Sequence, residues 1–146
     1  MHAIHQQAAD AGQPNVKVAF TEWLMVSDGH MGPHFSNMGG ALFAGGFLNM
    51  LMRNSDVLQI SDMTGILEFG GIWKKRSQVY VAPAYWVLRE YSRSHPRFLL
   101  DVSSDAPTYS VRHGVTRLPS IQNVPYLDCV ATEPETRWSA RLDLYQ

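Results

Sequence analysis

Short apolar runs alternate with longer helix-like segments between residues 16 and 94, and this alternation constrains the fold more than any other feature. Residues 16–20 and 56–60 have the length and composition of strands. Residues 39–53 and a segment that begins at Pro83 have hydrophobic residues at helical spacing, and proline is favoured at the first position of a helix. Two strands that each precede a helix predict a parallel pair, because a parallel connection needs a crossover that is usually helical. The apolar stripe of the first helix consists of Leu42, Phe43, Phe47, Met50 and Leu51.

The sequence changes character near residues 94–97. Between the two helical segments, residues 72–77 predict a basic loop that leads into an apolar run at 78–81. After residue 97, short apolar runs are separated by turn-forming residues, which is typical of antiparallel strands. We therefore predict an α/β part over residues 1–96 and the start of an antiparallel β-sandwich over residues 97–146. The strands expected in the second part are residues 98–102, 108–111 and 126–131.

Composition and charge exclude several classes of protein. The 146 residues are 45% hydrophobic, which suits a chain that buries a core. A net charge of −1 supplies no field for nucleic acid or for an anionic membrane, and no apolar run reaches the roughly 18 residues of a spanning helix. Cys129 is the only cysteine, so the sequence predicts neither an internal disulfide nor a zinc site. We therefore expect no nucleic-acid partner, no membrane partner and no metal.

Glu22 is the most informative single position. It lies where the first strand gives way to a long glycine-containing segment, and α/β enzymes place catalytic groups at such strand ends. The adjacent Trp23 offers an apolar wall or a platform for a sugar ring. A strand-end glutamate that pairs with an arginine is the structural alternative, and the residues alone leave both interpretations open.

A resemblance to a known family favours the catalytic interpretation. Residues 18–23 (Val-Ala-Phe-Thr-Glu-Trp), the helix at 40–56, residues 62–69 and the run from Gln78 to Trp86 together resemble the C-terminal third of the α-L-arabinofuranosidases of glycoside hydrolase family 51. The similarity extends over roughly residues 16–132. It implies the last two units of a (β/α)₈ TIM barrel, followed by the beginning of a jelly-roll β-sandwich. We therefore expect this chain to be a C-terminal portion of such an enzyme.

The resemblance also implies roles for individual residues. Glu22 corresponds to the family's nucleophile, which makes the enzyme a retaining glycosidase that releases arabinofuranosyl residues from arabinose-containing oligo- or polysaccharides. Gln78 corresponds to an amide that binds the sugar, and Trp23 lies beside the nucleophile. No cofactor is implied, and family members are often homo-oligomers. The family's acid/base glutamate lies in an Asn-Glu motif that this sequence lacks, so we expect the chain alone to be inactive.

Other candidates have simpler explanations. Leu24, Met25 and Val26 stand where the family often has an Asn-X-Trp extension, so a sugar contact there is not implied. Asp62 and Glu68 follow the second strand, where ion pairs are commoner than catalysis. His30 and His34 are separated by Gly32 and Pro33, which argues against a helical metal site.

A non-catalytic carbohydrate-binding or interaction module is the alternative function. We also predict large exposed apolar faces or pairing with other chains.

Overall fold

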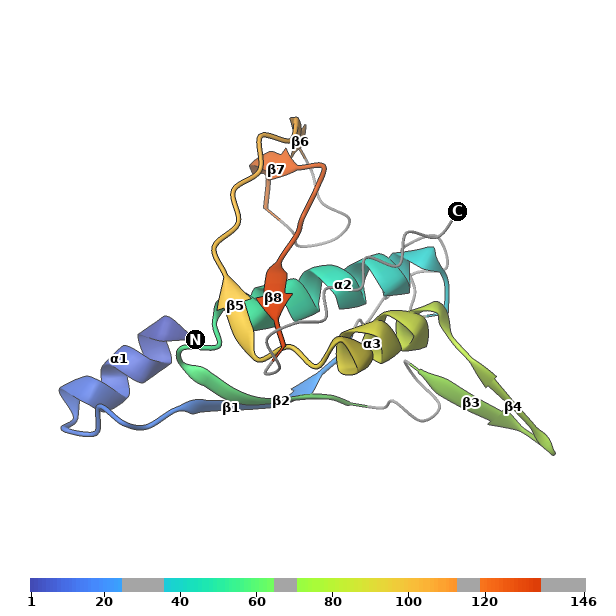
Figure 1. The fold of residues 1–146 in the computed structure, drawn as a ribbon, viewed down its shortest axis with the longest axis horizontal. Helices are drawn as coiled ribbons and strands as arrows, with labels where there is room; N and C mark the ends of the chain where they lie inside the picture. The colour runs from blue at the N-terminus through green and yellow to red at the C-terminus, as the bar shows by residue number, and fades with distance from the viewer. Residues whose placement is uncertain (25–35, 65–70, 113–118, 135–146) are drawn as a thin grey trace.

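The computed structural model describes residues 1–24, 36–64, 71–112 and 119–134, and Figure 1 shows their arrangement. Three helices and four two-stranded sheets make up this part of the chain. The elements in chain order are α1 (His2–Asp10), β1 (Val18–Trp23), α2 (Met38–Arg53), β2 (Leu58–Met63), β3 (Ile72–Lys75), β4 (Gln78–Val81), α3 (Pro83–Ser94), β5 (Phe98–Leu100), β6 (Thr108–Val111), β7 (Ile121–Pro125) and β8 (Ala131–Glu133).

Strands β1 and β2 form the predicted parallel pair, and α2 is the crossover between them. Helix α2 begins after Asn37, whose side-chain oxygen accepts a hydrogen bond of 2.9 Å from the backbone N–H of Gly39. One face of α2 packs on one face of the strand pair. The core cluster there consists of Trp23, Leu51 and Leu58, with Val18, Phe20, Phe43, Phe47, Leu48, Met50 and Met63 packed against it.

The small residues of α2 provide a second contact surface, for α3. Ala44 and Ala84 are each only 1% exposed, and a Cβ added to Gly45 would lie 3.8 Å from Cγ1 of Val87. Small side chains let the two helices approach closely. The core cluster contains four of the five residues of the predicted apolar stripe of α2. The exception is Leu42, which is 72% exposed.

The predicted basic loop at residues 72–77 is wrong, because these residues form most of an antiparallel hairpin. Strand β3 pairs with β4, so that Ile72 lies opposite Val81 and Lys75 lies opposite Gln78. The turn consists of Arg76 and Ser77, and Arg76 has a φ of 57°. A run of three basic residues suggested a loop, but a two-residue turn places them at the hairpin's end without interrupting the pairing.

The strand pairs that the structure describes within residues 97–112 and 119–134 are antiparallel, β5 with β8 and β6 with β7. The predicted strands at 98–102 and 108–111 are confirmed in type and position, to within two residues. The predicted strand at 126–131 is wrong, since strands occur before it at Ile121–Pro125 and after it at Ala131–Glu133. Polar residues in the first of these hid its strand character. The assignment to the last two units of a TIM barrel, the assignment to the beginning of a β-sandwich and the domain boundary at residue 96 stay predictions.

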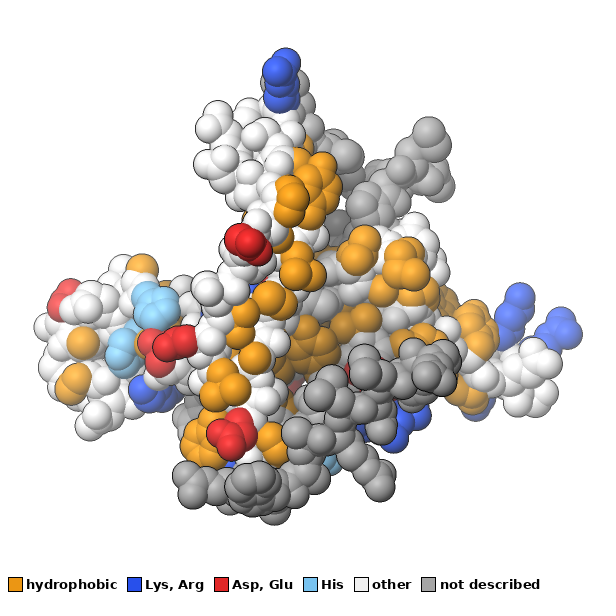
Figure 2. Space-filling model, turned by 45° about the horizontal axis from the view of Figure 1, so that its top comes forward, with side chains coloured by type: hydrophobic (Ala, Val, Ile, Leu, Met, Phe, Trp, Pro, Cys, Tyr) orange, Lys and Arg blue, Asp and Glu red, His pale blue; other side chains and the backbone are white. Residues whose placement is uncertain are grey.

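Hydrophobic side chains are widely exposed, as we expected, and Figure 2 shows them over several elements. All three residues of β5 are exposed, and so are Tyr109, Tyr126 and Leu127. Within the described ranges, no helix is long and apolar enough to cross a membrane.

Candidate active site

The carboxyl end of β1 contains a β-bulge between Phe20 and Trp23, the stretch that includes Glu22. Phe20 lies opposite Ser61 and Trp23 lies opposite Met63, so three steps along β1 match two steps along β2. The extra residue falls at Thr21 or Glu22. Bulges occur often beside active sites, because they change the direction in which a side chain points.

Glu22 lies on the face of the strand pair that α2 does not cover. Trp23 and Met63 both belong to the core cluster under α2, whereas Glu22 and Asp62, one residue earlier in each strand, are exposed. Phe20 and Trp23 both face the core and Thr21 and Glu22 between them are exposed, so Glu22, like Asp62, lies away from the core. Both sit at the carboxyl end of a parallel pair, where α/β enzymes bind their ligands.

The carboxylate of Glu22 is not locked into an ion pair within the part of the chain that the structure describes. The ion pairs there join His2 to Asp56, Arg53 to Asp128 and Arg89 to Glu90. The structural alternative of an arginine-paired strand-end glutamate is therefore not realised among these residues. A solvent-accessible, unpaired carboxylate can attack an electrophile that approaches the open face.

The side chain of Trp23 is buried, whereas a platform for a sugar ring needs an exposed ring face. Its side chain is 5% exposed, and its ring stacks on Phe47 with centroids 4.6 Å apart and an interplanar angle of 26°. Phe43 packs nearby, at 6.5 Å between centroids. An indole covered in this way has no free face for a ligand, so its burial does not favour the predicted sugar contact. Its packing instead anchors the strand end that presents Glu22.

Gln78 is not brought to Glu22. It is the first residue of β4, exposed beside the turn, and Figure 1 shows the hairpin extending from the body of the molecule with this turn at its far end. Glu68, His30 and His34 lie outside the described residues. Among the described residues, no group of three or more His, Cys, Asp or Glu side chains could hold a metal ion.

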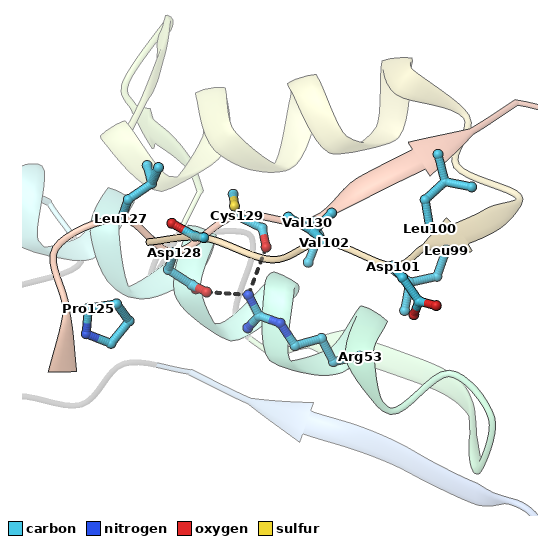
Figure 3. Close-up of a pocket in the computed structure, with 11 residues that line it drawn as sticks. Arg53, Leu99, Leu100, Asp101, Val102, Pro125, Leu127, Asp128, Cys129 and Val130 are labelled. Atoms are coloured by element: carbon cyan, nitrogen blue, oxygen red, sulfur yellow. Dashed lines mark hydrogen bonds and ion pairs between the residues drawn. The ribbon is translucent and has the colours of Figure 1, made fainter. Parts of the chain in front are cut away.

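A cavity of about 540 Å³ lies elsewhere, between α2 and the segments around β5 and β7. Figure 3 shows Arg53 reaching from α2 to Asp128 and to the carbonyl oxygen of Cys129. Glu22 does not line this cavity, so cavity size does not identify the candidate active site. The residues that line it are Arg53, Leu99, Leu100, Asp101, Val102, Ser104, Pro125, Leu127, Asp128, Cys129 and Val130.

Four polar side chains join the helices to the antiparallel part, and we call them the Asp128 network: Asn49, Arg53, Tyr91 and Asp128. The Asn49 amide donates to the Asp128 carboxylate at 3.1 Å, and the Tyr91 hydroxyl donates to Oδ1 of Asn49 at 2.5 Å. Burial, and then the negative charge of Asp128, raises the pKa of Tyr91, so this hydroxyl stays protonated. Sequence reasoning missed the network. The available signal was a polar Asn49 within an otherwise apolar helix, one turn before Arg53.

The Asp128 network predicts an acid-sensitive component of stability. Partial burial alone would raise the pKa of Asp128, but hydrogen bonds from Arg53 and Asn49 and the charge of Arg53 lower it below the ordinary 3.8. Because the pKa of Asp128 is lower in the folded state, its ionised carboxylate stabilises the fold at pH values above the ordinary pKa. This stabilisation is lost as the pH falls through the pKa of the folded state. We expect the melting temperature of Asp128→Asn to fall less steeply than that of the unmodified chain below about pH 4.

Thermal melts between about pH 2 and pH 6 would measure this difference. Asp101→Asn is the matched control, because Asp101 lines the same cavity, is exposed and forms no ion pair among the described residues. Parallel curves for Asp128→Asn and the unmodified chain would contradict the expectation.

Comparisons with known proteins find two solved structures that share the fold of most of this chain. An α-L-arabinofuranosidase from Thermotoga maritima, in complex with arabinose, aligns with 91% of the chain at a TM-score of 0.72 and 24% identity. An arabinofuranosidase aligns with 92% at a TM-score of 0.70 and 23% identity. The chain spans 29% of the length of each. No protein-family model and no curated protein matches the sequence.

Proposed function

We propose that this chain contributes the nucleophile of a retaining α-L-arabinofuranosidase, and that Glu22 is that nucleophile. The observation that carries the proposal is the exposed Glu22 at the bulged carboxyl end of a parallel strand, within a fold shared with part of two arabinofuranosidases. The substrate class is an arabinose-containing oligo- or polysaccharide. Membership of glycoside hydrolase family 51 is part of the same proposal.

The proposed reaction has two steps. The ionised Glu22 carboxylate attacks the anomeric carbon of the arabinofuranosyl unit through an oxocarbenium-like transition state, and the aglycone oxygen leaves with a proton. The resulting glycosyl ester is then hydrolysed by water, so the configuration at the anomeric carbon is retained. The second carboxyl group of such a pair lies about 5–5.5 Å from the nucleophile. We assign that acid/base group to polypeptide other than residues 1–146.

The core under the strand pair supports the nucleophile mechanically. Trp23 follows Glu22 directly and stacks on Phe47 of α2, so the backbone at the strand end is anchored from the opposite face. A carboxylate held on a rigid strand end keeps its distance from a bound substrate, and small misplacements are costly in catalysis. We therefore propose Trp23 as a positioning residue. The sugar contact of Gln78 and assembly into a homo-oligomer stay predictions.

Activity assays on two proteins test the proposed function. The chain alone is expected to show no hydrolysis of p-nitrophenyl α-L-arabinofuranoside above buffer, because general-acid assistance contributes about 10²- to 10⁴-fold and the site is incomplete. A chimera, in which the chain replaces the aligned 29% of the first arabinofuranosidase, is expected to hydrolyse it. Circular dichroism establishes that the chimera is folded. A folded chimera without activity would contradict the proposal, and turnover by the chain alone would contradict the assignment of the acid.

A further inference from the structure

The β3–β4 hairpin carries a concentration of positive charge at its end. Lys74, Lys75 and Arg76 are consecutive and exposed, and none of them forms an ion pair with a carboxylate of the described residues. Figure 2 shows basic side chains at the tip of this projection, beside hydrophobic ones. Three adjacent cations repel one another, so an anionic ligand would relieve that repulsion.

One face of the hairpin combines four groups that suit a charged sugar. Trp73 lies opposite Tyr80, and their rings stack with centroids 6.1 Å apart and an interplanar angle of 9°. Lys75 lies opposite Gln78, two residues along each strand, and alternation places this pair on the same face as the aromatic pair. An apolar ring surface, an amide and an ammonium group therefore follow one another along this face. Tyr80 is 48% exposed, so part of this ring surface is open to a ligand.

The turn itself holds a basic residue in an unfavourable conformation. Arg76 has a φ of 57°, in the left-handed region that favours glycine. The backbone therefore does not require arginine there. Glycine can replace it without disturbing the turn, which allows the charge to be removed separately from the fold.

We propose that this hairpin binds uronic acid residues of a polysaccharide, with Lys75 and Arg76 contacting the carboxylates and the aromatic pair packing on a pyranose ring. The two stacked rings leave no gap between them for a nucleobase. The surface is separate from Glu22, so the inference goes beyond the proposed hydrolysis and is independent of it.

Calorimetric titration of the 146-residue chain with a galacturonic acid oligosaccharide tests the inference. We expect binding at low salt that weakens as NaCl is raised toward 1 M, where the Debye length falls to about 3 Å. Lys75→Gln is expected to weaken binding about threefold, as for the loss of one surface ion pair, and Lys74→Gln, on the opposite face of the hairpin, is the matched variant with a smaller expected loss. Arg76→Gly is expected to weaken it about threefold while its melting temperature stays unchanged or rises.

Three controls make each outcome decisive. Arg112→Gln removes an exposed charge outside the hairpin and is expected to leave the affinity unchanged. Glu22→Gln is also expected to leave it unchanged, so failure of the hydrolysis proposal and failure of this one give different results. A neutral galactan oligosaccharide and a DNA duplex serve as competing ligands. No binding of the galacturonate oligosaccharide, equal or tighter binding of DNA or galactan, or equal loss in Arg112→Gln would overturn the inference.

Discussion

Glu22→Gln in the chimera is expected to lower kcat for p-nitrophenyl α-L-arabinofuranoside by about 10⁴- to 10⁶-fold, the scale seen when a catalytic nucleophile or its activating residue is removed. Glutamine has nearly the same shape as glutamate, but its amide is not a nucleophile and cannot form the glycosyl ester. Because Glu22 is exposed and forms no ion pair among the described residues, the substitution should not disturb the fold. Steady-state kinetics with matched melting curves would measure both properties.

Asp62→Asn is the matched control for this prediction. Asp62 is also exposed, and it comes one residue before Met63, the last residue of the neighbouring strand, as Glu22 comes before Trp23 in β1. The Asp62→Asn substitution also removes one negative charge from the carboxyl end of the strand pair, but it leaves the proposed nucleophile intact. We expect a loss of less than about tenfold, since a surface charge change without a direct role has a small effect. Equal losses in the two variants would mean that charge, and not nucleophilicity, matters at this face.

Trp23→Ala is expected to reduce the free energy of unfolding by about 3–5 kcal/mol, the range for removing a large aromatic side chain from a core. The indole stacks on Phe47, packs near Phe43 and is 5% exposed, so its removal leaves a cavity between β1 and α2. This is a large part of the 5–15 kcal/mol that stabilises most proteins. Urea denaturation followed by circular dichroism would measure it.

The control for the core prediction is another tryptophan. Trp86 on α3 is half exposed, with the Arg89 guanidinium 5.3 Å from its ring centroid. Trp86→Ala is expected to cost less, about 1–2 kcal/mol, because half of its surface is exposed and its removal leaves no enclosed cavity. If the two substitutions destabilised the chain equally, the core assigned to β1 and α2 would be wrong.

The helices and the parallel pair could be predicted because their signals are local. Periodic apolar residues indicated α2, Pro83 marked the start of α3, and the order of elements predicted that β1 and β2 run parallel. The end of β1 was also accessible, since a carboxylate after an apolar run is visible in the sequence. The bulge between Phe20 and Trp23 was not, because it depends on the register with a strand about forty residues later.

Long-range side-chain contacts were the part that local patterns could not provide. Asn49 and Asp128 are 79 residues apart, and although a polar residue within an apolar helix marks Asn49, nothing local identifies Asp128 as its partner. Trp23 was expected beside a ligand because it follows Glu22, yet adjacent residues in a strand face opposite sides and the helix covers its side. The hairpin was hidden for a different reason, because three basic residues predict a solvated loop unless the pairing of Lys75 with Gln78 is known.

Covalent trapping tests the central proposal most directly. The chimera would be incubated with an activated 2-fluoro arabinofuranoside, which slows hydrolysis of the glycosyl ester, and then digested for peptide mass spectrometry. We predict one added fluoroarabinosyl unit on the peptide that contains Glu22, located at that carboxylate by fragmentation and missing from Glu22→Gln. An adduct at any other residue, or normal turnover by Glu22→Gln, would contradict the assignment of Glu22 as the nucleophile.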